Sequence, residues 1–205
     1  MPKITAITAQ EKRKDRCNIY LDGEFFAGVS LETVMKFRLK AGAETDETQL
    51  KEIITAAENS EATEKALSYI SKTVKTKRQV KEYLLKKGYS ESACYHAIDK
   101  LKEYGYIDDC EYARRYIDST GKTQGKRLLA YKLMAKGVKK EDIEAAYETA
   151  GKNSAENAAA LAAKKMKNKD VTKENVLKTY RYLISRGFSY EEAERAVEPF
   201  KNGDD

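Results

Sequence analysis

The sequence predicts a mostly α-helical fold: three tandem three-helix repeats that form an elongated array, preceded by a small α/β region with a β-hairpin. Three observations favour this fold. Pro2 and Pro199 are the only prolines in 205 residues, so the interior carries no helix breaker. Glycines that would end a helix recur at a nearly constant spacing. Near the start of the chain, an Asp-Gly pair separates two apolar runs.

Residues 1–60 are expected to form a first domain that contains the hairpin. The runs 17–21 and 24–29 mix β-branched, aromatic and small residues, and Asp22-Gly23 lies between them. Asp-Gly favours a type I′ turn, because both central residues of that turn need a positive φ. We therefore expect two antiparallel strands joined at Asp22-Gly23.

Two helices are expected after the hairpin. Ser30 is positioned to cap a short helix that runs to about Lys40 and is ended by Gly42. A second helix should follow Thr45, since apolar residues then recur at helical spacing. The segment from Ala62 to Lys72 is read as a separate helix that opens the first repeat.

The repeats are defined by Gly88, Gly137 and Gly187, which are 49 and 50 residues apart. Each follows a segment of helical periodicity, and an alanine followed by an apolar residue comes nine residues later. A glycine just past a helix adopts a positive φ, so each of the three is expected to reverse the chain between two helices. The expected repeat domains are residues 61–108, 109–151 and 152–205.

Capping residues support these helix boundaries. Ser90 and Ser189 each come two residues after a repeat glycine and are expected to cap the helix that follows. Ser189 and Glu192 have the spacing of a capping box. Asp108 and Asp109 are read as the cap of a helix that begins near Cys110.

Basic residues are concentrated in the middle helices of the repeats. The chain has 39 basic and 33 acidic residues, for a net charge of +6. Between Lys72 and Lys87 seven basic residues stand against Glu82 alone, and residues 122–140 hold seven basic residues and no acid. The third helices are acidic instead. This pattern predicts a basic stripe and a polyanionic partner, although charged helix faces are often only solvated, and basic residues near a helix C-terminus also complement the dipole.

Catalysis has little support in the sequence. His96 is the only histidine, and no phosphate-binding loop, GxSxG motif or metal-spaced cluster occurs. Cys17, Cys94 and Cys110 form no CxxC pair, so free thiols in a reducing compartment are expected.

No segment has the ~20 apolar residues of a membrane span, and the start lacks the apolar region of a signal peptide. We expect a cytoplasmic, non-enzymatic protein without a cofactor. Sequence-specific reading of duplex DNA is disfavoured, because the acidic third helix would have to enter the major groove.

Three segments resemble the RecX regulatory protein family. Residues 104–116 (YGYIDDCEYARRY) resemble the linker and the start of that family's second repeat. Residues 125–129 (GKRLL), before Gly137, are similar to its second basic helix, and residues 183–190 (LISRGFSY) to its C-terminal signature. The match covers residues ~61–200 in order, with the same three-repeat layout. Tyr131 departs from the family, which more often has a polar residue there.

The resemblance implies a negative modulator of the RecA recombinase. Members of the family are understood to bind in the groove of the RecA filament on single-stranded DNA and to limit its ATPase, strand-exchange and coprotease activities, and so to act on homologous recombination, DNA repair and the SOS response. The expected partner is therefore the RecA filament, with single-stranded DNA as a possible second contact, and the protein is expected to act as a monomer. Two alternatives stay open: a direct nucleic-acid-binding protein that uses the basic stripe, and a helical scaffold for an unrelated protein.

The candidate filament- or phosphate-binding residues come from the same helix of successive repeats. They are Lys75, Lys77, Arg78 and Lys81 in the first repeat, Lys126, Arg127 and Lys132 in the second, and Arg181 and Arg186 in the third. Lys126 and Arg127 lie near a helix start, where the dipole disfavours cations, so local stability does not account for them. Leu128, Leu129, Leu133 and Met134 are expected on the core side of that helix.

Overall fold

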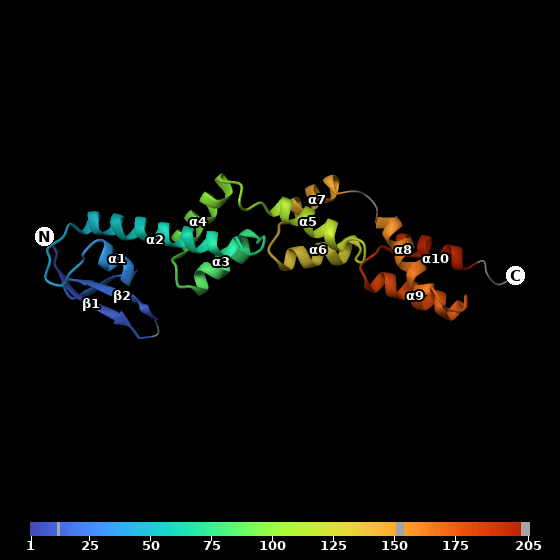
Figure 1. Ribbon diagram of the computed structural model, residues 1–205, viewed down its shortest axis with the longest axis horizontal. Coiled ribbons are helices and arrows are strands. Elements are labelled where there is room, and N and C mark those ends of the chain that lie inside the picture. Colours follow the sequence, from blue (N-terminus) through green and yellow to red (C-terminus); the bar gives the residue numbers. More distant parts are fainter. Residues whose placement is uncertain (12, 151–153, 202–205) are drawn as a thin grey trace. The chain divides into compact units, whose positions relative to one another are not determined.

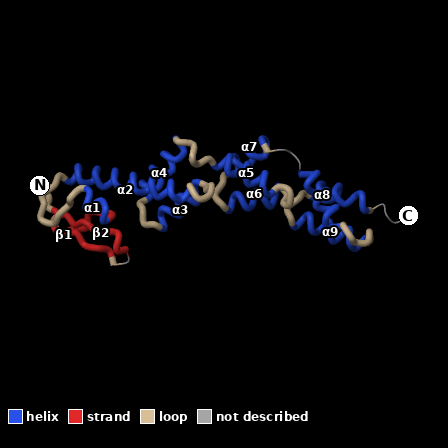
Figure 2. Tube along the Cα trace, in the orientation of Figure 1, coloured by secondary structure: helices blue, strands red, loops and turns tan. Residues whose placement is uncertain are grey.

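The computed structural model describes residues 1–11, 13–150 and 154–201 (Figures 1 and 2). In chain order the elements are β1 (Ile4–Gln10), β2 (Arg13–Leu21), β3 (Glu24–Ser30), α1 (Leu31–Lys36), α2 (Glu47–Ile70), α3 (Lys77–Lys86), α4 (Glu91–Glu103), α5 (Asp109–Thr120), α6 (Lys126–Ala135), α7 (Lys140–Thr149), α8 (Ser154–Met166), α9 (Lys173–Ser185), α10 (Tyr190–Val197) and the 3-10 helix η1 (Glu198–Phe200). The mostly helical fold with a small N-terminal sheet is confirmed. The chain divides into two compact units, Met1–Thr73 with Val80–Tyr106, and Val74–Gln79 with the chain from Ile107 onward.

The predicted hairpin is part of a three-stranded antiparallel sheet in the order β1-β2-β3. Asp22 and Gly23 both have a positive φ, 47° and 90°, as a type I′ turn requires. The strand β1 was not predicted; it pairs with β2, with Ile7 opposite Ile19. Helices α1 and α2 pack on the sheet and cover a core that contains Leu50 (Figure 1).

The helix α1 is shorter than predicted. Ser30 caps it as expected, and its side chain accepts a hydrogen bond from the Thr33 amide. The helix ends at Lys36 rather than about Lys40, because Arg38 takes the left-handed conformation, with φ 49°. Gly42 therefore does not end the helix. Its amide donates to the Ile4 carbonyl at 2.7 Å and ties the following loop to β1.

The helix α2 joins two segments that were predicted to be separate. It begins after Asp46, whose side chain accepts from the Gln49 amide, and it runs for 24 residues without a break. Its first half covers the sheet, whereas Ala62 and Ala66 in its second half are fully buried and the helix packs on α4. A boundary at residue 60 thus falls inside a continuous helix.

The three repeat glycines adopt the predicted conformation. Gly88, Gly137 and Gly187 have φ angles of 82°, 87° and 88°. In each turn the amide of the next residue donates to the carbonyl five positions earlier, the bond of a Schellman motif. Val138 and Phe188, which follow two of the glycines, are almost completely buried. Each repeat therefore packs back on itself at its glycine.

The predicted caps are also present. Ser90 caps α4, Asp108 caps α5 by accepting from two backbone amides, and Ser189 and Glu192 form the capping box of α10. Asp109 does not share the capping role. It is buried, and its partner comes from the preceding repeat.

Candidate binding surface on the middle helices

The first turn of α3 lies against the glycine turn that ends α6. Thr76 is fully buried there, and its hydroxyl donates to the Lys136 carbonyl at 2.7 Å. The Thr76 hydroxyl also accepts from the Gln79 amide at 3.2 Å, while the Gln79 side chain accepts from the Thr76 amide at 3.1 Å. This is a reciprocal capping box. The spacing Thr-x-x-Gln was its signal in the sequence.

Two predicted site residues, Lys77 and Arg78, are anchored at this contact. The Lys77 amide donates to the buried Asp109 carboxylate at 3.0 Å, and the Lys77 Nζ atom lies 4.0 Å from the same carboxylate. Burial raises the pKa of Asp109, and the Lys77 amide opposes that rise. The Arg78 guanidinium donates to the Ala135 carbonyl at 3.0 Å. Lys77 therefore joins the first turn of α3 to the start of α5, and Arg78 joins it to the end of α6.

The same contact recurs one repeat later, between the start of α6 and the glycine turn of α9. The Gly125 amide donates to the Arg186 carbonyl at 2.9 Å, and the Arg127 amide donates to the Gly187 carbonyl at 3.2 Å. The chains approach so closely that a Cβ atom on Gly125 would lie 2.3 Å from the Phe188 nitrogen. Helix α6 is thus held at both ends, by α9 at its first turn and by α3 at its last.

This arrangement corrects the electrostatic argument made for Lys126 and Arg127. The carbonyl end of α9, which carries a partial negative charge, lies against the amide end of α6. Cations at the first turn of α6 therefore also lie near carbonyl groups that favour them. The Lys126 ammonium in addition lies over the Tyr147 ring, 4.9 Å from its centroid. Local stability therefore accounts for part of the role of Lys126, whereas the Arg127 side chain has no such contact among the described residues.

Lys81 is also engaged within its own repeat. Its ammonium donates to the Tyr95 hydroxyl at 2.7 Å, lies over the same ring, and pairs with Glu91 at 3.1 Å. The hydrogen bonds that the Lys81 ammonium donates raise its pKa. The bond to Tyr95 has the largest effect and the bond to Glu91 the next largest. Lys81 is therefore a weaker candidate for an external contact.

Three further predicted residues are partly buried. The Lys132 ammonium donates to the Gln124 side chain at 2.8 Å. The Arg186 guanidinium donates to the Tyr182 hydroxyl at 3.2 Å and lies over its ring, 5.2 Å from the centroid. Lys75 is half-buried just before α3. These side chains are not displayed as a free basic surface.

Arg127 and Arg181 are the predicted residues that remain available. Both are exposed, and their guanidinium groups make no hydrogen bond or ion pair with any part of the chain that the structure describes. On α6, Arg127 shares one face with Tyr131 and Met134, which are 67% and 47% exposed. We call Arg127, Tyr131 and Met134 the α6 stripe.

The prediction that Met134 lies on the core side was wrong. Leu129 and Leu133 fill the core and are almost completely buried, and Leu128 is half-buried. Met134 follows Leu133 by one residue, or about 100° around the helix, which turns it to solvent. Arg, Tyr and Met are enriched at protein–protein interfaces, where Lys is depleted. Sequence reasoning counted charges and missed this mixed stripe.

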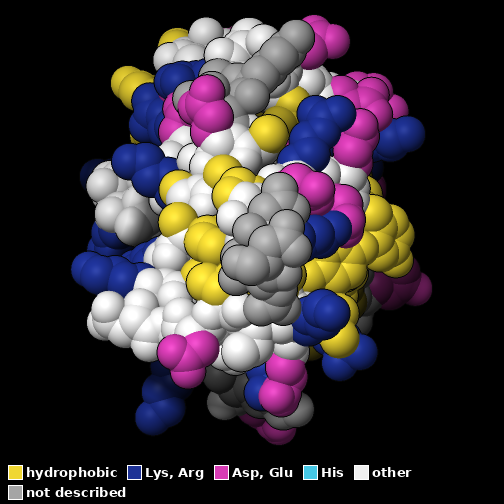
Figure 3. Space-filling model, turned by 90° about the vertical axis from the view of Figure 1, so that its right-hand side faces the viewer, with side chains coloured by type: hydrophobic (Ala, Val, Ile, Leu, Met, Phe, Trp, Pro, Cys, Tyr) yellow, Lys and Arg dark blue, Asp and Glu magenta, His cyan; other side chains and the backbone are white. Residues whose placement is uncertain are grey.

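The third repeat carries an apolar groove with charged side chains at its edge. Figure 3 shows hydrophobic side chains exposed between charged ones on one face of the protein. The groove has a volume of about 550 Å³ and lies between α9, α10 and η1. Leu177 and Val171 line it and are 47% and 42% exposed. Among the described residues, no helix is long and apolar enough to cross a membrane, and no group of His, Cys, Asp and Glu side chains is placed to hold a metal ion.

Four family profiles match the chain in order. The RecX N-terminal domain matches residues 2–46, and the first, second and third three-helix domains of RecX match residues 62–101, 108–146 and 153–197. The chain belongs to the RecX family of regulatory proteins. The profile for the RecX N-terminal domain extends the resemblance to the sheet region, which the sequence motifs had not reached.

Individual RecX proteins are similar over nearly the whole chain. The regulatory protein RecX of Clostridium botulinum strain Alaska E43 is 36% identical over 196 residues, which cover 93% of this chain and 92% of that protein. RecX of Bacillus licheniformis is 33% identical and covers 97% of this chain and 77% of its own length. A crystal structure of regulatory protein RecX, 31% identical, matches with a TM-score of 0.64 over 95% of this chain and 98% of that one. RecX from Lactobacillus salivarius shares the fold, with a TM-score of 0.65 at 24% identity over 71% of this chain and 98% of that chain.

Proposed function

We propose that this protein binds filaments of the RecA recombinase on single-stranded DNA and inhibits their activity in recombination and DNA repair. Membership of a family of regulatory proteins supports this proposal, and the family's name and motifs point to RecA. The protein would act by binding alone, as a monomer in the cytoplasm, and would need no cofactor.

The observation that carries the proposal is the α6 stripe. Arg127 and Tyr131 are of the types that dominate binding energy at protein interfaces, and Met134 is of a type enriched there. The stripe lies on a helix whose first turn is bonded to the α9 turn and whose last turn accepts bonds from Thr76 and Arg78. A rigid helix positions an interface more accurately than a loop does.

The test is RecA-driven ATP hydrolysis on single-stranded DNA, measured with increasing amounts of this protein. Tyr131→Ala is expected to raise the concentration needed for half inhibition at least tenfold, about 1.4 kcal/mol, because it removes an interface anchor that is 67% exposed in the protein alone. Arg127→Gln should have an effect of similar size. Lys65→Gln, which removes an exposed charge from the second half of α2, is the matched control and should inhibit like the unmodified protein.

Two results would contradict the proposal. Full inhibition by Tyr131→Ala and Arg127→Gln variants that melt normally would remove the α6 stripe from the mechanism. Absence of any effect of the unmodified protein on ATP hydrolysis would favour a scaffold for an unrelated partner.

A second candidate is direct binding of nucleic acid. It is favoured by the exposed guanidinium groups of Arg127 and Arg181, which have no ion-pair partner in the described part of the chain and suit phosphate contacts. The two candidates differ in how tightly the protein should bind bare single-stranded DNA and in how strongly salt should weaken that binding.

A further inference from the structure

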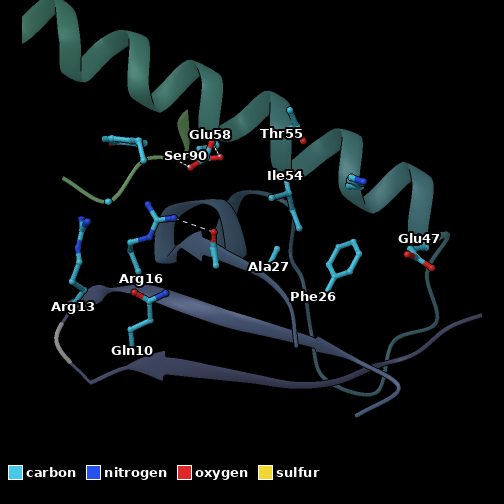
Figure 4. Close-up of a pocket in the computed structure, with 14 residues that line it drawn as sticks. Gln10, Arg13, Arg16, Phe26, Ala27, Glu47, Ile54, Thr55, Glu58 and Ser90 are labelled. Carbon is cyan, nitrogen blue, oxygen red and sulfur yellow. Dashed lines mark hydrogen bonds between the residues drawn. The ribbon is translucent and has the colours of Figure 1, made fainter. Parts of the chain in front are cut away.

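A cavity of about 610 Å³ lies in the first compact unit, between the sheet, α2 and the glycine turn after α3 (Figure 4). Gln10, Arg13 and Arg16 lie toward one end of it, and Phe26 and Glu47 toward the other. Sites for small molecules have volumes of ~300–1,000 Å³. The cavity has no part in the proposed contact with RecA through α6.

Arg16 is a buried cation without a carboxylate partner. Arg16 is only 7% exposed; among the described residues its guanidinium donates one hydrogen bond, to the Gly28 carbonyl at 3.0 Å, and lies 6.0 Å from the centroid of the Tyr89 ring. No carboxylate among the described residues lies within ion-pair distance of it. A buried charge is normally paired, because removing it from water is costly. The remaining donors of Arg16 are thus available to a ligand in the cavity.

Two glutamates that line a small neighbouring cavity with Arg16 are engaged by other donors. Glu58 accepts from the Ser90 amide at 2.9 Å and from the Ser90 hydroxyl at 2.8 Å (Figure 4). Glu61 accepts from the Ser30 hydroxyl at 2.5 Å and from the Thr33 hydroxyl at 2.7 Å. Both carboxylates therefore make the electrostatic potential around Arg16 more negative, but neither forms an ion pair with its guanidinium.

Arg13 adds a second guanidinium at the same end. It lies against the glycine turn, where a Cβ atom on Gly88 would be 2.4 Å from its Nη1 atom. Its partner is Asp15 at 2.9 Å, whose side chain is 69% exposed. Such an exposed ion pair is weak and exchanges readily for a stronger acceptor. Two guanidinium groups match the charge of a phosphate monoester, ≈ −1.5 to −2 at neutral pH, better than the single charge of a carboxylate.

We infer that this cavity binds a nucleoside monophosphate, with the phosphate at Arg13 and Arg16 and the base toward Phe26. The Phe26 ring offers a surface on which a base can stack. Glu47, at the same end, is an acceptor for an exocyclic amino group, so adenine, guanine and cytosine are preferred over uracil.

Isothermal titration calorimetry of the full chain tests this inference, with AMP, GMP, CMP, UMP, inorganic phosphate and glutamate as probes. At least one of AMP, GMP and CMP is expected to bind more tightly than UMP and inorganic phosphate. Arg13→Gln should weaken that binding at least tenfold. Lys14→Gln, which removes an exposed charge next to Arg13 but outside the cavity, should leave it unchanged.

Arg16→Gln should weaken binding as much as Arg13→Gln. If that variant does not fold, Phe26→Leu takes its place and should reduce the affinity for AMP, GMP or CMP but not for inorganic phosphate. Four results would overturn the inference: no binding of any phosphate probe at millimolar concentration, an equal loss in Lys14→Gln, tighter binding of glutamate than of every nucleotide, or tighter binding of a 5′-phosphorylated oligonucleotide than of the mononucleotide.

Discussion

At the scale of single residues, glycines that each follow a helix have different roles in the fold. Gly105 and Gly137 both have a positive φ, 69° and 87°. A Cβ atom on Gly105 would meet nothing within 4 Å, whereas one on Gly137 would lie 2.4 Å from the Arg78 Cβ atom. Gly105 therefore meets only a backbone requirement, and Gly137 also allows two helices to touch.

This difference predicts unequal costs of substitution. Gly105→Ala should lower the free energy of unfolding by about 1 kcal/mol, the strain of a left-handed residue. Gly137→Val should lower it by roughly 3 kcal/mol, because a β-branched side chain at positive φ must also displace Arg78. Urea unfolding of both variants measures the difference. Equal losses would mean that the contact between α3 and the α6 turn contributes little.

Gly125 marks the limit of what the sequence could predict about glycines. The repeat glycines were found because each follows a periodic helical segment and reverses the chain. Gly125 has an ordinary φ of −78°, so nothing local distinguishes it. It is needed because the backbone at Phe188, far away in the sequence, comes within 2.3 Å of where its Cβ atom would be. Contacts of this kind depend on tertiary packing.

Tyr147 predicts a loss of stability at alkaline pH. Burial raises the pKa of its hydroxyl to about 12, above the ordinary value of ~10, so the fold favours the neutral form. The corresponding stability is fully present below pH ~10 and is lost as the pH rises from ~10 to ~12. Tyr147→Phe should reduce the fall in melting temperature across this range. If the two proteins lose stability in parallel, the hydroxyl is not buried in solution.

At the scale of elements, the contact between successive middle helices is the feature that the sequence least revealed. Arg78 and Arg127 each occupy the second position of a middle helix and follow a lysine. The Arg78 side chain bonds to the Ala135 carbonyl, whereas Arg127 uses only its backbone amide, toward Gly187. Identical dipeptides thus have different roles.

A matched pair of substitutions tests this distinction. Arg78→Ala should destabilise the protein by about 0.5–1.5 kcal/mol, since it removes a hydrogen bond that joins the first turn of α3 to the end of α6. Arg127→Ala should change the free energy of unfolding by less than about 0.5 kcal/mol, as is usual for a surface position without partners. Thermal and urea unfolding of the two variants provide the comparison. A larger loss for Arg127→Ala would show that it, too, is a structural residue.

Local signals predicted the hairpin and the caps, and non-local ones were missed. Asp22-Gly23 and Ser30 act on neighbouring residues, so their roles follow from the sequence. The strand β1 depends on pairing with β2, and the length of α2 depends on two different partners, the sheet and α4. No proline or glycine interrupts residues 47–70, so the absence of a breaker was the signal for one helix.

At the scale of the whole molecule, many of the basic side chains counted on the middle helices have partners within the protein, so the count alone does not identify a surface that is free to bind. The charged groups of five basic residues contact other groups within the protein: Lys77, Arg78, Lys81, Lys132 and Arg186. These basic side chains, which the sequence suggested would contact a partner, instead join helices or pair with nearby side chains. What remains on α6 is a mixed polar and apolar stripe, which suits a protein partner better than a chain of phosphates.

This conclusion predicts that the protein prefers the RecA filament to bare DNA. Its affinity for the filament on a labelled oligonucleotide should exceed its affinity for the same oligonucleotide alone at least tenfold at equal salt, because Tyr131 and Met134 need a protein surface to bury them. Contacts of Arg127 and Arg181 with two phosphates would give a log–log salt slope of only about −1.4 on single-stranded DNA. Fluorescence anisotropy with and without RecA, over a range of salt concentrations, measures both quantities. Tyr131→Ala should weaken filament binding and leave binding to bare DNA unchanged. Equal affinities for the filament and bare DNA, with a slope much steeper than −1.4, would instead establish direct nucleic-acid binding through many phosphate contacts.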